Sequence, residues 1–316
     1  MNALSTNMPQ RLALGQGPAA LRTLLREQPF VIAPGVHDLY SLRVVEQGGF
    51  DSAAISGAVL SHVLLGMPDV GLVTLTEAVE HCRRIVRAAS IPVTADADAG
   101  YGNAFGVHHA VQLFEEAGAA GINLEDQVVP RRWGAEPGKE VVSEAEMVAK
   151  IAAACRARRN PAFTLIVRTD AFACESTASV VRRCRAYQDA GADLIMPIGP
   201  RGEADVEAVV QALDVPVSLN VGTGLATAAS AGHVSVQRLR ALGVRRVSLP
   251  GLLPAAAAGA MADALRQFQA RLAGEQTTGA APVQAAALPA LMGDATWLTL
   301  ESRLLQGEGA SQHGPA

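Results

Sequence analysis

The stretch "EEAGAAGINLED", residues 115–126, shows the unit from which we predict the fold. A helix-like segment ends at a glycine, and an apolar run begins within a few residues. Glycine closes a helix in the left-handed conformation, and the apolar run that follows is typical of a buried strand. The same unit recurs in "EQGGFDSAAISG" (46–57), "QDAGADLIMPIG" (188–199) and "RALGVRRVSLPG" (240–251).

Runs of this kind predict eight strands, separated by segments of helical length. The strands are expected at 30–36, 52–57, 92–98, 121–126, 164–170, 194–198, 216–221 and 246–250, and helices at 74–90, 106–118, 143–158, 176–190 and 203–213. Alternating strands and helices give parallel strands, and eight units over about 250 residues suit an α/β fold of the (β/α)8 TIM-barrel type. The alternative, an open doubly wound sheet, needs a glycine fingerprint after its first strand, which "APGVHDLYS" (33–41) lacks.

Two regions fall outside the repeated unit. We expect an N-terminal arm over 1–17, a catalytic barrel over 18–272, and a linker with a helical tail over 273–316. The linker "AGEQTTGAAPVQAA" (273–286) has few large apolar groups, whereas "LPALMGDATWLTLESRLLQ" (288–306) can form a helix. A helix beyond a finished barrel needs something to pack on, which favours a homo-oligomer.

Composition and charge exclude several classes of protein. The chain has 316 residues, 49% of them hydrophobic, and a formal net charge of −4. Its basic residues are dispersed in short pairs such as Arg245-Arg246, so we expect no nucleic-acid partner. We also expect no membrane span and no signal peptide. The cysteines match neither a zinc site nor a dense disulfide framework, which favours free thiols and a cytoplasmic location; they are Cys82, Cys155, Cys174 and Cys184.

Polar residues gather where the predicted strands end, which is where barrel enzymes carry their chemistry. They are Ser56-Gly57, Asp96, Asp98, Glu125-Asp126, Arg168-Thr169-Asp170 and Asn220. Period-two geometry would point Asp96 and Asp98 to one face. Two like charges there require a cation, and with Glu125 they form an oxygen cluster suited to Mg²⁺ or Mn²⁺. Zinc is disfavoured because no His or Cys lies at these ends.

Several of these residues also have simpler interpretations. Asp126 and Asp170 could be helix caps, and Arg168 could pair with Asp96 or Glu125 instead of binding substrate. A Schiff-base mechanism is disfavoured because the two lysines, Lys139 and Lys150, lie at no predicted strand end. Two histidines could reach the carboxyl ends of the strands, His37 after the first strand and His233 after the seventh. Packing or surface roles are expected for His81, His108 and His109.

Five motifs together resemble the isocitrate lyase/phosphoenolpyruvate mutase superfamily, from about residue 18 to 270. They are "ISGAVLSHVLLGMPDVGLVTLTE" (55–77), "ADADAGYGNAFGV" (95–107), "AGAAGINLEDQVVPRRWG" (117–134), "GKEVVS" (138–143) and "IVRTDA" (166–171). The resemblance implies a Mg²⁺-binding barrel that acts on 2-oxo or 2-hydroxy carboxylates. It also implies a terminal helix exchanged between subunits, in a dimer of dimers.

The resemblance implies a role for each matching position. Substrate carboxylate binding falls to Ser56 and Gly57 with Ala58 beside them, and a hydrogen bond to substrate falls to Asn220. Arg168 would pair with a substrate carboxylate. The metal roles are direct binding by Asp96, water-mediated binding by Asp98 and Glu125, and ordering of the site by Asp69.

The chain departs from the lyase branch at its acid–base groups. Trp133 stands where that branch carries a cysteine, Ala135 stands where it carries a histidine, and Ile198 or Gly199 occupies the place of a glutamate after strand six. The Lys-x-Asn-Ser lid of the phosphonate-mutase branch is missing too. An aromatic residue at position 133 resembles the decarboxylase branch.

These departures favour one reaction over two alternatives. Decarboxylation of oxaloacetate or a related acid, through a metal-stabilised enolate, needs no base to start it. The first alternative is a carbon–carbon lyase on a 2-methylisocitrate- or dimethylmalate-like acid, with Tyr101 or His233 as acid–base group. The second is a phosphorus–carbon enzyme with phosphate near "NVGTG" (220–224). A non-catalytic binding protein is disfavoured because it has little use for a metal cluster.

The segment 127–142 is predicted to be a lid. It directly follows strand four and carries Pro130, Gly134, Pro137 and Gly138. Closure would exclude water, with Trp133 as an apolar wall over the ligand and Arg131 or Arg132 near a second carboxylate. The alternative places Trp133 permanently against the barrel or a neighbouring subunit.

Overall fold

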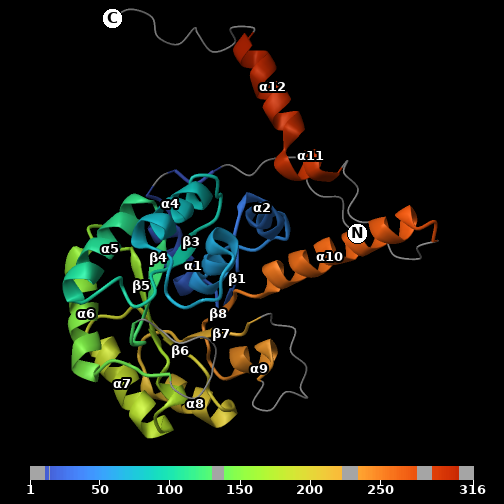
Figure 1. Ribbon diagram of the computed structural model, residues 1–316. Coiled ribbons are helices and arrows are strands. Elements are labelled where there is room, and N and C mark those ends of the chain that lie inside the picture. Colours follow the sequence, from blue (N-terminus) through green and yellow to red (C-terminus); the bar gives the residue numbers. More distant parts are fainter. Residues whose placement is uncertain (1–10, 14, 130–138, 223–233, 276–286, 306–316) are drawn as a thin grey trace, which may run out of the picture.

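A computed structural model describes residues 11–13, 15–129, 139–222, 234–275 and 287–305, and it confirms the predicted barrel (Figure 1). Each predicted strand run contains one strand: β1 (Val31–Pro34), β2 (Ala53–Ala54), β3 (Val93–Asp96), β4 (Gly121–Glu125), β5 (Thr164–Thr169), β6 (Leu194–Pro197), β7 (Ser218–Asn220) and β8 (Arg246–Leu249). Strands β2 to β6 pair in chain order, and β8 pairs with both β1 and β7. Parallel bridges Gly35–Ala54 and Ile195–Val217 join the two sheets and close the ring.

An outer layer around these strands (Figure 1) is formed by α2 (Leu39–Gln47), α3 (Gly57–Leu60), α4 (Leu75–Val86), α5 (Ala104–Glu116), α6 (Glu144–Ala157), α7 (Thr177–Asp189), α8 (Glu203–Ala212) and α9 (Val236–Ala241). Helix α1 (Gly17–Glu27) packs against the barrel interior through Leu21 and Leu25, and α10 (Leu252–Leu272) extends away from the ring. Helices α4 to α8 match the five predicted segments. Local sequence explains where they begin: Thr74 and Glu77 form a reciprocal capping box at α4, and Ser143 caps α6.

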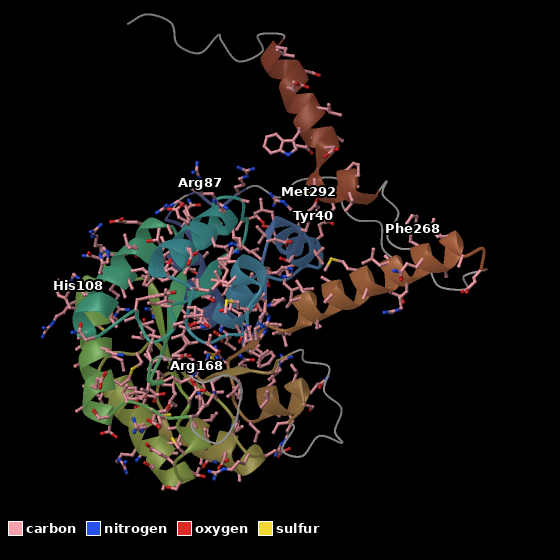
Figure 2. All side chains as sticks on the ribbon, viewed as in Figure 1. Tyr40, Arg87, His108, Arg168, Phe268 and Met292 are labelled. Atoms are coloured by element: carbon pink, nitrogen blue, oxygen red, sulfur yellow. The ribbon has the colours of Figure 1, made fainter. Side chains whose placement is uncertain are left out.

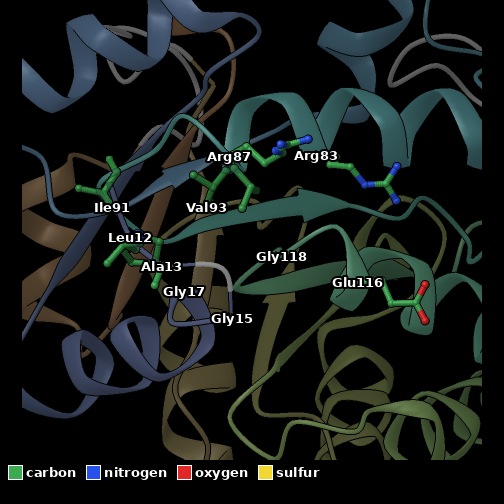
Figure 3. Close-up of a pocket in the computed structure, with 12 residues that line it drawn as sticks. Leu12, Ala13, Gly15, Gly17, Arg83, Arg87, Ile91, Val93, Glu116 and Gly118 are labelled. Carbon is green, nitrogen blue, oxygen red and sulfur yellow. The ribbon is translucent and has the colours of Figure 1, made fainter. Parts of the chain in front are cut away.

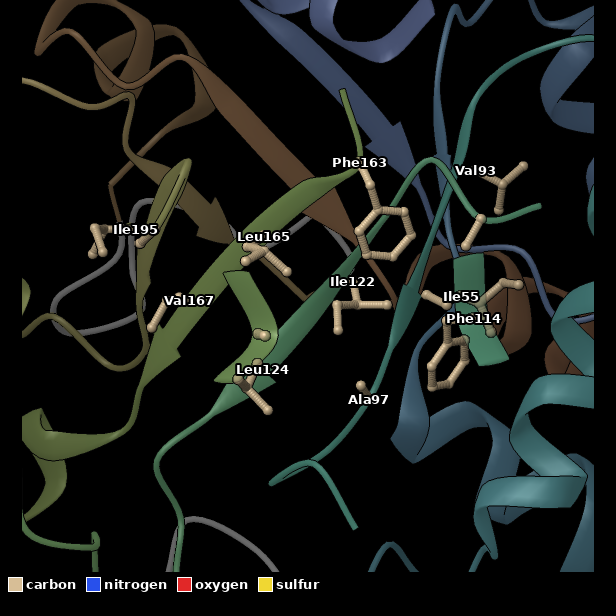
Figure 4. Close-up of a cluster of buried hydrophobic side chains, with 14 of the residues drawn as sticks. Ile55, Val93, Ala97, Phe114, Ile122, Leu124, Phe163, Leu165, Val167 and Ile195 are labelled. Carbon is tan, nitrogen blue, oxygen red and sulfur yellow. The ribbon is translucent and has the colours of Figure 1, made fainter. Parts of the chain in front are cut away.

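Alternate residues of each strand face the helices or the barrel interior. In β4, Ile122 and Leu124 belong to the core under the helices, together with Phe114 of α5 (Figure 4). The intervening Asn123 and Glu125 are buried polar residues, and Asn123 lines a cavity inside the ring. In β4 the period-two alternation therefore directs apolar side chains outward into the core and polar side chains inward.

Helix α10 begins beside the ring and extends away from it, and the tail follows. No side chain of α10 is buried, and Figure 1 shows the helix extending beyond the barrel. The predicted tail helix is present as α11 (Ala287–Met292) and α12 (Asp294–Leu305). Helix α11 contacts α2, where the Gln47 amide donates a hydrogen bond to the Leu291 carbonyl at 3.4 Å. In the described part of the chain, no helix has the length and apolarity needed to cross a bilayer.

Candidate active site

A cavity of about 630 Å³ opens at the carboxyl ends of the strands. Six strands or their ends contribute polar lining residues: Ser56, Asp96, Asn123, Arg168, Asn220 and Ser248. Ala58, His62 and Asp69 line it from the segment after β2, and Pro254, Ala255 and Ala258 line it from α10. Figure 2 shows Arg168 inside the ring of strands. Six predicted site residues thus share one cavity: Ser56, Ala58, Asp69, Asp96, Arg168 and Asn220.

A second cavity, of about 370 Å³, lies at the opposite end of the barrel (Figure 3). Its lining includes Ile91 and Val93, where the chain enters β3, and Gly118, just before β4. None of the predicted site residues lines this cavity. Barrel enzymes place their chemistry at the carboxyl ends of the strands, so the first cavity is the candidate site.

Asp96 and Asp98 converge for a reason that differs from the predicted one. Strand β3 ends at Asp96, and Asp98 has a φ of +46°, so the period-two argument does not apply to the pair. A turn brings the two together: the Asp98 N–H donates to Asp96 Oδ1 and the Gly57 N–H donates to Asp96 Oδ2, each at 3.1 Å. A Cβ on Gly57 would lie 2.8 Å from Asp98 Oδ1 and 3.2 Å from Asp96 Oδ2. Both carboxylates therefore border the space that glycine leaves open.

Glu125 and Arg168 form a buried ion pair beside these carboxylates. Arg168 Nη1 lies 2.9 Å from Glu125 Oε2, and the Gln127 amide donates to Glu125 Oε1 at 3.1 Å. Burial alone would lower the pKa of the Arg168 guanidinium, but Glu125, Asp170 and Asp96 outweigh it and raise that pKa above its ordinary value. Of the two interpretations of Arg168, the structure shows ion pairing with Glu125.

Asp170 is a second partner of Arg168 and not a simple helix cap. It accepts hydrogen bonds from Arg168 Nε at 2.7 Å and Nη2 at 3.1 Å. Lys139 Nζ donates to the same carboxylate at 2.5 Å. Lys139 lies at no strand end, as predicted, and it does not line the cavity, but its side chain reaches Asp170 just after β5. The spacing along the chain gave no sign of this contact, since the two residues are 31 positions apart.

Asp126 is a buried acceptor of three hydrogen bonds and not a helix cap. It accepts hydrogen bonds from the Thr169 hydroxyl at 2.6 Å, the Asp170 N–H at 2.9 Å and the Tyr187 hydroxyl at 2.9 Å. Burial raises the pKa of the Asp126 carboxyl above its ordinary value, against these three hydrogen bonds. Asp126 thus fixes the backbone that carries Asp170, and through it the Arg168 guanidinium.

Other predicted residues have different surroundings. Tyr101 has a φ of +56°, packs against the hydrophobic core and does not line the cavity. Asn220 lines the cavity while its Oδ1 accepts from the Gly222 N–H at 2.9 Å. The His37 carbonyl contacts His81 Nε2 at 2.9 Å, and burial lowers the His81 pKa, as expected for a packed histidine. Trp133 and His233 lie outside the described residues, as does most of the predicted lid.

Sequence reasoning did not identify three residues near the cavity. Asn123 lines it, and its buried Oδ1 accepts no hydrogen bond within the described residues. His62 lines it from a π-helical turn, residues 61–65. Buried Lys150 donates to the Ala99 carbonyl at 3.1 Å, beside the Asp98 turn. The alternation Ile122–Asn123–Leu124 was a usable signal for Asn123, whereas the other two depend on tertiary placement.

The predicted three-carboxylate cluster is not assembled. Within the described ranges, no group of three His, Cys, Asp or Glu side chains is placed to hold a metal ion. Glu125 faces Arg168, while Asp96 and Asp98 face the space beside Gly57. Two carboxylates beside that space, with the unpartnered Asn123 Oδ1 also lining the cavity, are oxygen donors of the kind that Mg²⁺ prefers. These residues therefore fit a hard divalent cation, with water completing its coordination.

Comparison with known proteins places the chain in a family. The family model for phosphoenolpyruvate phosphomutase matches residues 21–269. The chain is 44% identical to 2,3-dimethylmalate lyase of Eubacterium barkeri over 191 residues, which cover 60% of this chain and 66% of that protein. It is 38% identical to oxaloacetate decarboxylase of Rhodopseudomonas palustris (strain TIE-1) over 239 residues, 76% of this chain and 80% of that protein.

A solved structure agrees with these sequence matches. Phosphonopyruvate hydrolase in complex with oxalate and Mg²⁺ has a TM-score of 0.79 and 30% identity, covering 92% of this chain and 99% of that one. The resemblance carried by the motifs is thereby confirmed, together with the barrel fold. The chain belongs to the phosphoenolpyruvate phosphomutase family and is an enzyme of the lyase type found there.

Proposed function

We propose that this protein is a Mg²⁺- or Mn²⁺-dependent carboxy-lyase that releases CO₂ from oxaloacetate or a related 2-oxo dicarboxylate. The observation that carries the proposal is that Arg168 and Asp96 line one cavity, with Asp98 held next to Asp96. Arg168 offers a planar cation for a carboxylate, and Asp96 and Asp98 border the space beside Gly57. The 38% identity to an oxaloacetate decarboxylase supports the choice of substrate.

The chain's own residues supply binding, orientation and charge. Asp96 and Asp98 would hold the cation, with Asn123 and Glu125 near its waters. When bound, the cation supplies positive charge to the keto and carboxylate oxygens of the substrate. Arg168 would bind the second carboxylate, because its Nη2 and Nε can exchange Asp170 for a substrate of the same geometry. Ser56 and Asn220 would orient the substrate from two other strand ends.

The apolar part of the cavity lining favours a second candidate. Its members are Val59, Met196, Pro254, Ala255 and Ala258. Apolar lining of this kind suits an alkyl-substituted acid, and the chain is 44% identical to a 2,3-dimethylmalate lyase. The candidate is therefore a carbon–carbon lyase acting on a substituted 2-hydroxy dicarboxylate.

A substrate panel distinguishes the candidates. Oxaloacetate, 2,3-dimethylmalate, 2-methylisocitrate and phosphonopyruvate would each be incubated with the protein and Mg²⁺, while CO₂, pyruvate, glyoxylate and phosphate are followed. We expect CO₂ and pyruvate from oxaloacetate, and no activity in excess chelator. Catalysed cleavage of 2,3-dimethylmalate without decarboxylation would favour the second candidate, and phosphate release would contradict both.

We further propose that the protein is a homo-oligomer built through α10. Met261, Leu265, Phe268 and Leu272 form one stripe of that helix, with 58–73% of each residue exposed. Figure 2 shows Phe268 on the part of α10 that extends away from the barrel. An apolar stripe of this length is typical of a subunit interface. Light scattering should give a multiple of the 32.7 kDa chain mass, and Phe268→Glu should lower it; an unchanged monomeric mass for both would contradict the proposal.

A further inference from the structure

Arg246 is a cation without a carboxylate partner inside the barrel. Its exposed fraction is 0%, and its guanidinium bonds to two neutral groups, the Ser218 hydroxyl at 3.2 Å and the Thr94 hydroxyl at 3.0 Å. The Nε atom has no hydrogen-bond partner, and no acidic side chain of the described chain pairs with Arg246. Burial lowers the pKa of this guanidinium to about 10, so it remains charged at neutral pH. Burying a charge without a counter-ion costs free energy of folding, and Arg246 is buried in spite of that cost.

The position of Arg246 relates it to the cavity. Arg246 lies two residues before Ser248 on β8, and its partners Ser218 and Thr94 lie two residues before Asn220 and Asp96. Ser248, Asn220 and Asp96 all line the cavity. Residues two apart on a strand share a face and lie about 6–7 Å apart. The guanidinium therefore occupies the interior layer directly beneath the polar floor of the cavity.

The charges around the cavity suggest a role for the positive charge of Arg246. Asp69, Asp96, Asp98, Glu125 and Asp170 surround the cavity or the groups that line it, against Arg168 and Lys139. Even with a divalent cation bound and Arg168 holding one carboxylate of the ligand, the negative charges of these five acids outnumber the positive charges, so a doubly charged carboxylate enters a site that is already net negative.

We propose that Arg246 is a positioning residue whose buried charge stabilises the anionic ligand from beneath the cavity floor, without touching it. The inference deepens the proposed function and rests on it in taking the ligand to be a carboxylate anion held with a divalent cation. Because Arg246 is fully buried, its charge acts through the interior of the barrel, where electrostatic interactions are stronger than in water.

The test measures two affinities of one variant: its affinity for oxalate should fall and its affinity for Mn²⁺ should rise. Arg246→Met removes the charge and keeps an unbranched side chain. Its affinity for oxalate in the presence of Mg²⁺, by calorimetry, should fall roughly tenfold, the scale of one unit charge about 10 Å away at an effective dielectric constant near 20. Its affinity for Mn²⁺ alone, by electron paramagnetic resonance, should rise several-fold because a repelling charge is gone. Parallel losses of both affinities would indicate a purely structural role and overturn the proposal, as would two unchanged affinities.

The adjacent arginine provides a matched control. Arg245 donates from Nη2 to the Leu25 and Gln28 carbonyls near the other end of the barrel, so Arg245→Met should change neither affinity. Arg246→Lys keeps the charge and should hold both affinities within about threefold of the wild type; a tenfold loss in this variant would overturn the proposal even if Arg246→Met did not fold. Failure of the wild type to bind oxalate would contradict the proposed function, while the Mn²⁺ measurement would still test Arg246.

Discussion

Two arginines lie inside the same barrel in opposite electrostatic surroundings. Arg168, on β5, contacts the carboxylates of Glu125 and Asp170, which raise its pKa against the effect of burial. Arg246, on β8, contacts only hydroxyl groups within the described structure, and burial lowers its pKa to about 10. Arg168 faces the cavity and Arg246 lies beneath it. Acids of the fold compensate the charge of Arg168, whereas no acid of the described chain pairs with Arg246.

The two arginines should therefore respond differently to neutralisation. Arg168→Met leaves Glu125 and Asp170 as buried charges without their main partner, and we expect a loss of about 3–5 kcal/mol in the free energy of unfolding. Arg246→Met relieves the cost of burying a charge that no acid balances, but it also removes the hydrogen bonds to Ser218 and Thr94. These effects oppose each other, so the free energy of unfolding should change by less than about 1 kcal/mol. Urea unfolding monitored by circular dichroism measures both. Equal losses in the two variants would remove the distinction between them.

Asp96 is related to both arginines. Its charge raises the pKa of Arg168, and it lies on β3 two residues after Thr94, whose hydroxyl accepts a hydrogen bond from Arg246. Asp96→Ala should lower turnover roughly a hundredfold or more, the scale of losing a main stabiliser of an oxyanion. Steady-state rates at saturating Mg²⁺ measure this loss. The matched variant Asp193→Ala removes a carboxylate that pairs with Arg22 and Arg158 away from the cavity, and it should retain near-normal turnover. Comparable turnover of Asp96→Ala and the wild type would contradict the metal assignment.

The sequence predicted the barrel better than the contacts inside it. Apolar runs located all eight strands, and four of these runs follow a helix that ends at a glycine; both signals are local. The convergence of Asp96 and Asp98 was predicted correctly but for the wrong reason, since the left-handed conformation of Asp98 follows the end of the strand. The Lys139–Asp170 contact depends on tertiary placement of residues distant in sequence.

The Arg245-Arg246 pair also shows that the sequence does not predict tertiary contacts. Neighbouring residues on a strand point to opposite faces, and here one arginine bonds to carbonyls of the α1 region while the other enters the barrel. Sequence alone showed two adjacent charges in an apolar run and did not indicate that one of them lacks a counter-ion. The missing information is which strands lie opposite β8 across the ring.

Arg168→Lys tests the geometry of the paired arginine and not its charge. A lysine keeps the charge but cannot bind a carboxylate with two parallel N–H groups. We expect the KM for a dicarboxylate substrate to rise about tenfold, with a smaller change in kcat and a loss of unfolding free energy of about 1–2 kcal/mol. If the KM stays constant while stability falls, Arg168 serves only the ion pairs with Glu125 and Asp170.

Lys139→Met should have the smallest effect, and its pH dependence makes it measurable. Burial opposes ionisation of the Asp170 carboxyl, but Arg168 and Lys139 together lower its pKa below the ordinary value. A carboxyl with a lowered folded-state pKa contributes stability above its unfolded-state pKa of about 3.9, and this contribution is lost as pH falls through the folded-state value. Without Lys139, the Asp170 pKa should rise, so stability at neutral pH falls by about 1 kcal/mol and the acid-unfolding midpoint moves to higher pH.

The other lysine provides the control. Lys150 donates to the Ala99 carbonyl and not to Asp170. Lys150→Met should therefore lower stability without changing the Asp170 pKa or the part of the acid-unfolding profile that depends on it. An acid-unfolding profile of Lys139→Met parallel to that of the wild type would show that Arg168 alone keeps Asp170 ionised.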